Sequence, residues 1–124
     1  FQIEAFPHPA IVHLFQLPQI LKYKKGLLAQ RQAELARLRG YILDDLPGLQ
    51  PPLDVAQSSI ELPPIPSTGK ALKVVEDQLD SVICAYIAAH WWYWGAARNV
   101  VLGDRAEGYI VVPMPFSEPS VLPG

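Results

Sequence analysis

Acidic side chains offer the most informative chemistry in this sequence. Asp77 and Asp80 are three residues apart in a helical segment, and at about 100° per residue their carboxylates project from one face. Glu4 lies in a strand-like segment, where burying an unpaired charge would cost on the order of several kcal/mol. Because Mg²⁺ and Mn²⁺ prefer oxygen ligands, Glu4, Asp77 and Asp80 are candidate metal ligands. The alternative for the helical acids is that they complement the helix dipole.

A basic segment is the second candidate for chemistry. From Lys22 to Arg39 the sequence has six basic residues and one acid, Glu34. The basic residues are densest at Lys22, Lys24 and Lys25, which could bind the phosphates of a nucleic acid. The alternative is a solvated face that happens to be basic. The formal net charge of −2 argues against a nucleic-acid-binding protein that is basic throughout.

Histidine and cysteine are less informative. His8 follows the first strand-like segment and could reach a site beside Glu4, although a hydrogen-bonding role fits it equally well. His13 and His90 lie on apolar helical faces, where core or interface positions are expected. One cysteine and three scattered histidines do not form a zinc-site spacing, and Cys84 has no recognisable nucleophile context.

Length and composition predict one ordinary domain or part of one. The chain has 124 residues, of which 50% are hydrophobic and 18% charged. Its single cysteine cannot form an intramolecular disulfide, and the sequence shows no secretory leader, so we expect a cytoplasmic protein. The apolar run at residues 82–97 is shorter than the roughly 20 residues that span a membrane, which favours a buried helix.

The elements that position these residues begin with a short strand at residues 1–6. Residues 9–16 follow as a helix that starts at a proline, and residues 18–26 form a loop that contains Lys22, Lys24 and Lys25, here called the basic loop. Leucine spacing at residues 27–39 predicts an amphipathic helix that ends at Gly40.

The second half of the chain begins with a proline-rich connection. Residues 47–67 contain six of the thirteen prolines, which excludes regular helix or central strand there. A long helix is predicted for residues 70–94, followed by two strands at residues 99–102 and 109–112 that form a hairpin.

This mixture of elements is α/β, but it holds too few strands for a self-standing sheet. We therefore expect either strands contributed from upstream of Phe1 or a second copy of the chain. The aromatic residues at 91–94 spread around most of the helix, so some of them should meet another element or a partner. A homo-oligomer, or a domain that needs a preceding N-terminal part, is expected.

Four motifs resemble those of one family. Residues 3–10 are similar to the strand-to-helix entry E-x-h/y-P of the domain of unknown function 429 family, generally described as predicted RNase H-like nucleases. Residues 22–26 look like its basic Y-K element, and residues 76–85 resemble its h-D-x-x-D-A helix, with serine in place of the usual alanine. Residues 103–113 are similar to its closing G-D-x-x-E-G-x-I-x-x-P. The four motifs occur in the family's order over nearly the whole chain.

The resemblance implies the C-terminal portion of an RNase H-like domain, with a long helix and a terminal β-hairpin, covering residues 1–124 as one partial domain. It implies a metal-dependent nuclease that hydrolyses phosphodiesters, with Glu4, Asp77 and Asp80 as three of four acids that hold Mg²⁺ or Mn²⁺. The fourth, a first-strand Asp, would precede Phe1, so we expect the chain alone to be inactive. The alternative is a non-catalytic interaction or structural module. A divalent ion between the acids would favour the nuclease, whereas carboxylates neutralised by Lys or Arg would favour the module.

Overall fold

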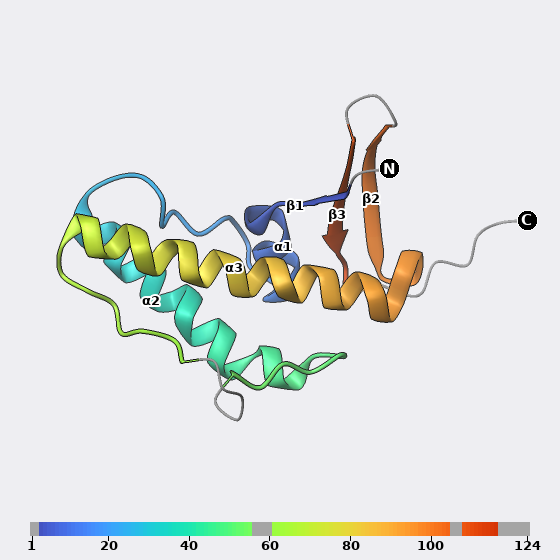
Figure 1. Ribbon diagram of the computed structural model, residues 1–124, viewed down its shortest axis with the longest axis horizontal. Helices are drawn as coiled ribbons and strands as arrows, with labels where there is room; N and C mark the ends of the chain where they lie inside the picture. Colours follow the sequence, from blue (N-terminus) through green and yellow to red (C-terminus); the bar gives the residue numbers. More distant parts are fainter. Residues whose placement is uncertain (1–2, 56–60, 105–107, 117–124) are drawn as a thin grey trace, which may run out of the picture.

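The computed structural model describes residues 3–55, 61–104 and 108–116, and is mostly helical (Figure 1). Its helices and strands are β1 (Ile3–Ala5), α1 (Pro7–Leu14), α2 (Leu28–Asp44), the 3-10 helix η1 (Leu46–Gly48), α3 (Gly69–Trp94), the 3-10 helix η3 (Gly95–Ala97), β2 (Asn99–Asp104) and β3 (Gly108–Pro113). Helix α3 runs along most of the molecule, with α2 beside its first half and the β2–β3 hairpin near its C-terminal end.

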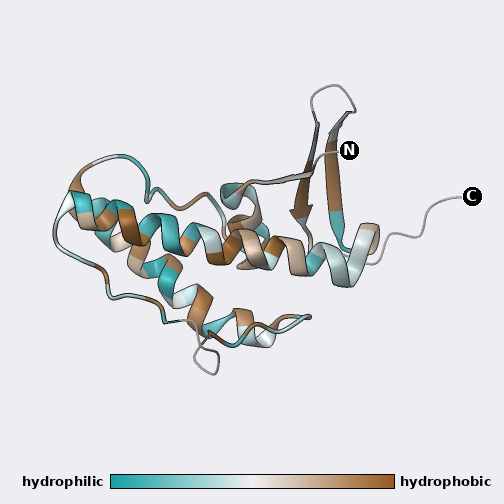
Figure 2. Cartoon of the chain, in the orientation of Figure 1, coloured by the Kyte–Doolittle hydropathy of each residue, from teal (hydrophilic) through white to brown (hydrophobic). Residues whose placement is uncertain are grey.

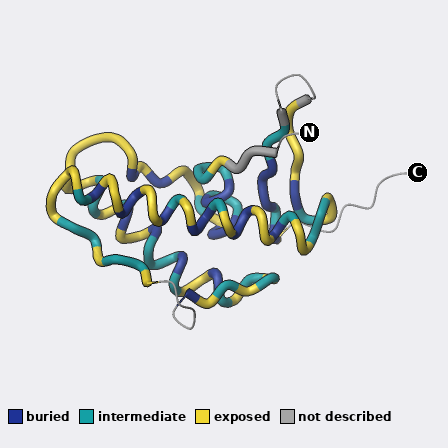
Figure 3. Tube along the Cα trace, viewed as in Figure 1, coloured by how far each residue is buried: buried dark blue, intermediate teal, exposed yellow. Residues whose placement is uncertain are grey.

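Helix α3 confirms the predicted long helix. Its N-cap is Thr68, whose side-chain oxygen accepts a hydrogen bond from the backbone N–H of Ala71 at 3.3 Å. The helix ends at Gly95, whose φ of 55° favours glycine. Buried and exposed residues alternate along α3 because one stripe contacts the rest of the protein (Figure 3). In the described part of the chain, no helix is both long and apolar enough to cross a lipid bilayer.

The predicted boundaries of the other two helices were wrong. Helix α1 begins at Pro7 rather than Pro9, because Pro7 can take a first-turn position where no intrahelical N–H bond is needed. Helix α2 continues through Gly40 to Asp44. Glycine in a helix costs about 1 kcal/mol relative to alanine. Burial of Leu38 and Ile42 on either side offsets that cost, so Gly40 does not stop the helix.

The described strands form one sheet in the order β1-β3-β2. Strand β1 pairs with β3 in parallel, placing Glu4 opposite Ile110, while β2 and β3 are antiparallel with Val101 opposite Val111. The predicted terminal hairpin is therefore confirmed, as is the long helix. The RNase H-like assignment stays a prediction.

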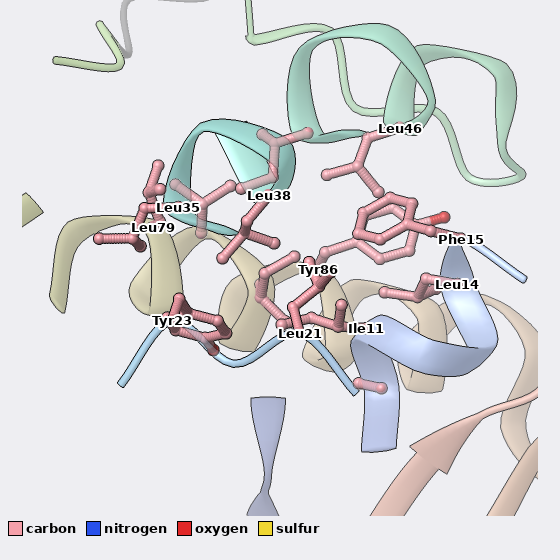
Figure 4. Close-up of a cluster of buried hydrophobic side chains, with 14 of the residues drawn as sticks. Ile11, Leu14, Phe15, Leu21, Tyr23, Leu35, Leu38, Leu46, Leu79 and Tyr86 are labelled. Atoms are coloured by element: carbon pink, nitrogen blue, oxygen red, sulfur yellow. The ribbon is translucent and has the colours of Figure 1, made fainter. Parts of the chain in front are cut away.

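The core lies where α1, α2 and α3 meet (Figures 2 and 4). Leu35 and Leu38 of α2 contact the stripe of α3 that contains Leu79, and Figure 4 shows these side chains grouped together. The aromatic residues near the end of α3 differ in their surroundings, as expected. Trp92 is 90% exposed, whereas the indole N–H of Trp94 donates to the backbone carbonyl of Gln50.

A buried polar contact connects the end of α3 to the start of β2. The fully buried His90 ring contacts the side-chain oxygen of Asn99 through Nδ1 at 2.8 Å, and Asn99 donates to the carbonyl of Gly95 at 2.7 Å. In the described part of the chain, His90 Nε2 has no hydrogen-bond partner. Burial lowers the pKa of His90 from its ordinary 6.5, an effect that the Asn99 hydrogen bond opposes. The folded protein therefore favours the neutral ring.

We expect the free energy of unfolding to fall as the pH falls below about 6.5, because His90 takes up a proton more readily in the unfolded chain than in the folded chain. Stability from this source is fully present above that pH and is lost towards the lower pKa of the folded state. Urea unfolding at about pH 8 and about pH 5 measures the difference. His90→Gln should reduce the difference. An equal pH dependence in the wild type and His90→Gln would contradict the assignment.

Candidate functional site

One face of α3 brings together two carboxylates that are largely removed from solvent. The side chains of Glu76 and Asp80 are 2% and 14% exposed. They are four residues apart, so they lie one turn apart on the same face. The side chain of Asp77, in contrast, is 64% exposed. The sequence indicated Asp77 and Asp80 as a pair, whereas by burial Asp80 is grouped with Glu76.

Asp80 is the residue at which two of the predicted motifs meet. Its Oδ1 accepts a hydrogen bond from the hydroxyl of Tyr23, and its Oδ2 pairs with Nζ of Lys24, each at 2.6 Å. Tyr23 and Lys24 belong to the basic loop, more than fifty residues away in sequence. Both carboxylate oxygens of Asp80 therefore have a partner from that loop.

Tyr23 provides a rigid support for Asp80. Its ring is completely buried among core side chains, as Figure 4 shows beside Leu21 and Leu79. Burial, and then the hydrogen bond to Asp80, raise the pKa of Tyr23 far above its ordinary value of 10.0. The hydroxyl therefore keeps its proton and donates a hydrogen bond to Asp80 throughout the physiological pH range.

His8 lies on the other side of Tyr23, at the start of α1. The two ring centroids are 5.1 Å apart, and His8 Nδ1 is buried with no hydrogen-bond partner in the described part of the chain. Burial and the nearby charge of Lys24 lower the pKa of His8, against the opposing charges of Asp80 and Glu76. The folded protein therefore favours the neutral ring of His8.

Lys73 compensates the two remaining acids of α3. Its Nζ lies 2.8 Å from Glu76 Oε2 and 3.1 Å from Asp77 Oδ1. Lys73 itself is 60% exposed, so these are ion pairs with a lysine at the surface. Sequence reasoning missed Glu76, although its four-residue spacing from Asp80 was a usable signal.

The structure describes the backbone position of Glu4 and not its side chain. It is the central residue of β1 and lies opposite Ile110 of β3, and β1 contacts α3. Its side chain lies outside the described part of the structure, so its distance from Asp80 stays a prediction. Among the described side chains, no group of three His, Cys, Asp or Glu could hold a metal ion.

The three predicted basic residues border a pocket next to His8. Lys22, Lys24 and Lys25 are exposed, and they line it together with His8, Ile20 and Leu21. The pocket has a volume of about 360 Å³. Because Lys24 also contacts Asp80, this basic pocket and the Asp80 carboxylate are adjacent. An anionic group could bind in the pocket close to Asp80.

Comparison with known proteins gives one match. Neither the curated proteins nor the solved structures include a match to this chain. Residues 1–107 match the family described as "Protein of unknown function (DUF429)", and this range includes Glu4, the basic loop and all of α3. The chain therefore belongs to the DUF429 family.

Proposed function

We propose that this chain contributes to a metal-dependent nuclease of RNase H-like type, which hydrolyses phosphodiester bonds in nucleic acid. In this proposal Asp80 is the central metal ligand, Glu4 and Asp77 are the further ligands, and the cation is Mg²⁺ or Mn²⁺. Lys22, Lys24 and Lys25 bind phosphates of the substrate. The single cysteine supports a cytoplasmic location.

The position of the basic loop beside Asp80 is the observation that carries this proposal, whereas the neutralisation of Asp80 by Lys24 favours the second candidate described below. The sequence separately predicted Asp80 as a metal ligand and Lys24 as a phosphate-binding residue. In the structure Lys24 Nζ lies 2.6 Å from Asp80 Oδ2. A phosphodiester held by the lysines of this loop would lie next to the carboxylate that is proposed to bind the metal. This adjacency is what hydrolysis of a bound phosphodiester requires.

The acids fit a hard divalent cation in their chemistry. Asp80 and Glu76 are carboxylates withdrawn from water, and each is compensated by a lysine that is itself partly exposed. Such lysines can turn outwards when another cation takes over the compensation, because their side chains are flexible and solvated. Glu76 is thereby a further acid near Asp80, one helical turn away on the same face of α3. When bound, a divalent cation would lower the pKa of a water molecule and stabilise the charge of the leaving oxygen.

The remaining residues hold Asp80 in place or neutralise the charge of the substrate. Tyr23 holds the Asp80 carboxylate through its hydroxyl, so that the acid does not have to be ordered when substrate arrives. Lys24, released from Asp80, neutralises a phosphate oxygen. His8 lines the adjoining pocket beside these lysines, and its ring packs against Tyr23.

The protein expressed from its complete gene is expected to cleave single-stranded or double-stranded DNA or RNA in the presence of Mn²⁺ or Mg²⁺. EDTA should abolish cleavage, and added Mn²⁺ should restore it, because the carboxylates cannot polarise water without a cation. Gel analysis of labelled substrates measures the products. Cleavage that persists unchanged in EDTA would contradict the metal dependence, and intact substrate under every divalent cation would contradict the nuclease.

A second candidate is a non-catalytic interaction module. It is favoured by the pairing of Asp80 with Lys24 and of Asp77 with Lys73, which leaves both aspartates compensated by lysine. It is also favoured by the exposed apolar residues Val101 and Leu102 on β2, an edge strand of the described sheet, and by Trp92. Such a surface suits a second copy of the chain. This candidate predicts an oligomer that binds its partner equally well with or without EDTA.

A further inference from the structure

A second pocket lies beside the one that contains His8, on the other side of the basic loop. It is formed between residues 18–26 and α2, and has a volume of about 540 Å³. The two pockets have four lining residues in common: Ile20, Leu21, Lys22 and Lys25. A ligand longer than one phosphate group could therefore pass from one pocket to the other across Lys22 and Lys25.

One face of α2 forms the far wall of this second pocket. Gln30, Ala33, Glu34 and Arg37 line it, and their spacing places them on a single helical stripe. The buried residues Leu35 and Leu38 point instead to the core. The stripe that includes Arg37 thus faces the pocket, and the Arg37 guanidinium is held there by Glu34 and by the hydroxyl of Tyr41.

The charge of the second pocket is positive. Lys22, Lys25 and Arg37 line it, against the single acid Glu34. Both oxygens of that acid are engaged: Oε2 accepts from the backbone N–H of Lys22 at 3.1 Å, and Oε1 pairs with Arg37 at 3.2 Å. Glu34 therefore holds the loop and orients Arg37, while the lysine side chains stay available for an anion.

The loop reaches this position through a glycine. Gly26 has a φ of 106°, and a Cβ at this position would lie 3.0 Å from Oε1 of Gln30. The chain thus enters α2 with a backbone conformation and a close approach that suit glycine. Gly26 and Gln30 both line the pocket, so this turn also fixes the pocket's shape.

We propose that the second pocket binds the sugar-phosphate backbone of a single nucleic-acid strand, one or more nucleotides away from the phosphate held near Asp80. The inference rests on the proposed nuclease function, and names its substrate as a single strand. A single strand can bend into two adjoining concave pockets, whereas the phosphates of a duplex lie on a stiff convex surface. In the described part of the chain no Phe, Tyr or Trp lines either pocket, so binding is through the backbone and is independent of sequence.

The test is fluorescence anisotropy with a labelled oligonucleotide of about 10 nucleotides, measured in EDTA so that no cleavage is needed. Arg37→Gln combined with Lys25→Gln should weaken binding of the single strand by about tenfold near 50 mM salt, and each lost charge should reduce the salt-dependence slope by about 0.7. Arg37→Lys should largely restore binding. Lys70→Gln, which removes an exposed lysine that lines neither pocket, is the matched control and should change nothing.

Three results would overturn the inference. These are binding unaffected by the double substitution in a variant whose circular dichroism matches the wild type, a duplex bound as tightly as the single strand, and polyphosphate competing as well as the oligonucleotide. Failure of the two proposals can be told apart. Binding that follows this pattern without any metal-dependent cleavage would refute the nuclease and leave the strand-binding pocket. Metal-dependent cleavage with no contribution from Arg37 and Lys25 would support the nuclease and refute the strand-binding pocket.

Discussion

Replacing Asp80 by asparagine is expected to lower metal-dependent cleavage by about a hundredfold or more, the loss typical of removing one electrostatic group from an active site. Asparagine preserves the shape of the side chain, and its oxygen can still accept the hydrogen bond from Tyr23. It removes the charge that would bind the cation and that now pairs with Lys24 at 2.6 Å. The fold should therefore survive. Initial cleavage rates at saturating Mn²⁺, for the protein expressed from its complete gene, measure the effect.

Substitutions of two other aspartates provide a control and a comparison for this experiment. Asp44→Asn changes an exposed acid at the end of α2 and should leave cleavage unaltered. Asp77→Asn should have an effect smaller than that of Asp80→Asn, because the Asp77 side chain is 64% exposed and that of Asp80 only 14%. Equal rates for the wild type and Asp80→Asn would remove Asp80 from the mechanism. Equal losses for the two variants would instead give Asp77 and Asp80 the same role.

The elements that the sequence predicted best are those with strong local signals. Helix α3 has an apolar stripe over 26 residues, a threonine cap and a terminal glycine, and all three indicate the same helix. The hairpin has two β-rich runs joined by a polar segment. The predicted end of α2 was wrong because Gly40 was expected to end the helix. Burial of Ile42 beyond Gly40 keeps the chain helical. Tertiary packing there outweighs a local preference of about 1 kcal/mol.

The candidate site was predictable only in part, for a different reason. Helical spacing can place Asp77 and Asp80 on α3, but it cannot say which side of the helix the rest of the chain covers. The covered side turns out to include Glu76, which is 2% exposed, and to leave Asp77 in solvent. The contacts of Asp80 with Tyr23 and Lys24 join residues 57 and 56 positions apart. No periodicity within one element carries such information.

The second pocket was also beyond sequence reasoning, although its residues were in view. Lys22, Lys25 and Arg37 were counted as a basic run, but their arrangement around a cavity depends on how the loop returns to α2. That return is fixed by the backbone N–H of Lys22 donating to Glu34, and by the turn at Gly26. The one acid in the basic run is thus the residue that organises it.

Tyr86 is expected to show the largest effect on stability among single changes in α3. The residue is 1% exposed, and its hydroxyl donates to the backbone carbonyl of Pro51 at 2.7 Å. It therefore connects the helix that carries Asp80 to the proline-rich connection. Burial raises the pKa of Tyr86, so the hydroxyl stays protonated and the hydrogen bond does not depend on pH in the ordinary range.

Tyr86→Ala should lower the free energy of unfolding by about 3–5 kcal/mol, since it removes a whole buried ring and leaves a cavity. The matched change Tyr86→Phe keeps the ring and removes only the hydroxyl, so it should cost about 1 kcal/mol. Urea unfolding followed by circular dichroism measures both values, and the difference between them isolates the packing of the ring from the hydrogen bond to Pro51. Since Tyr86 does not contact the basic pocket, Tyr86→Phe should also leave oligonucleotide binding unchanged. If the two substitutions cost the same, the ring contributes little and the connection to residues 47–55 is made by the hydroxyl alone.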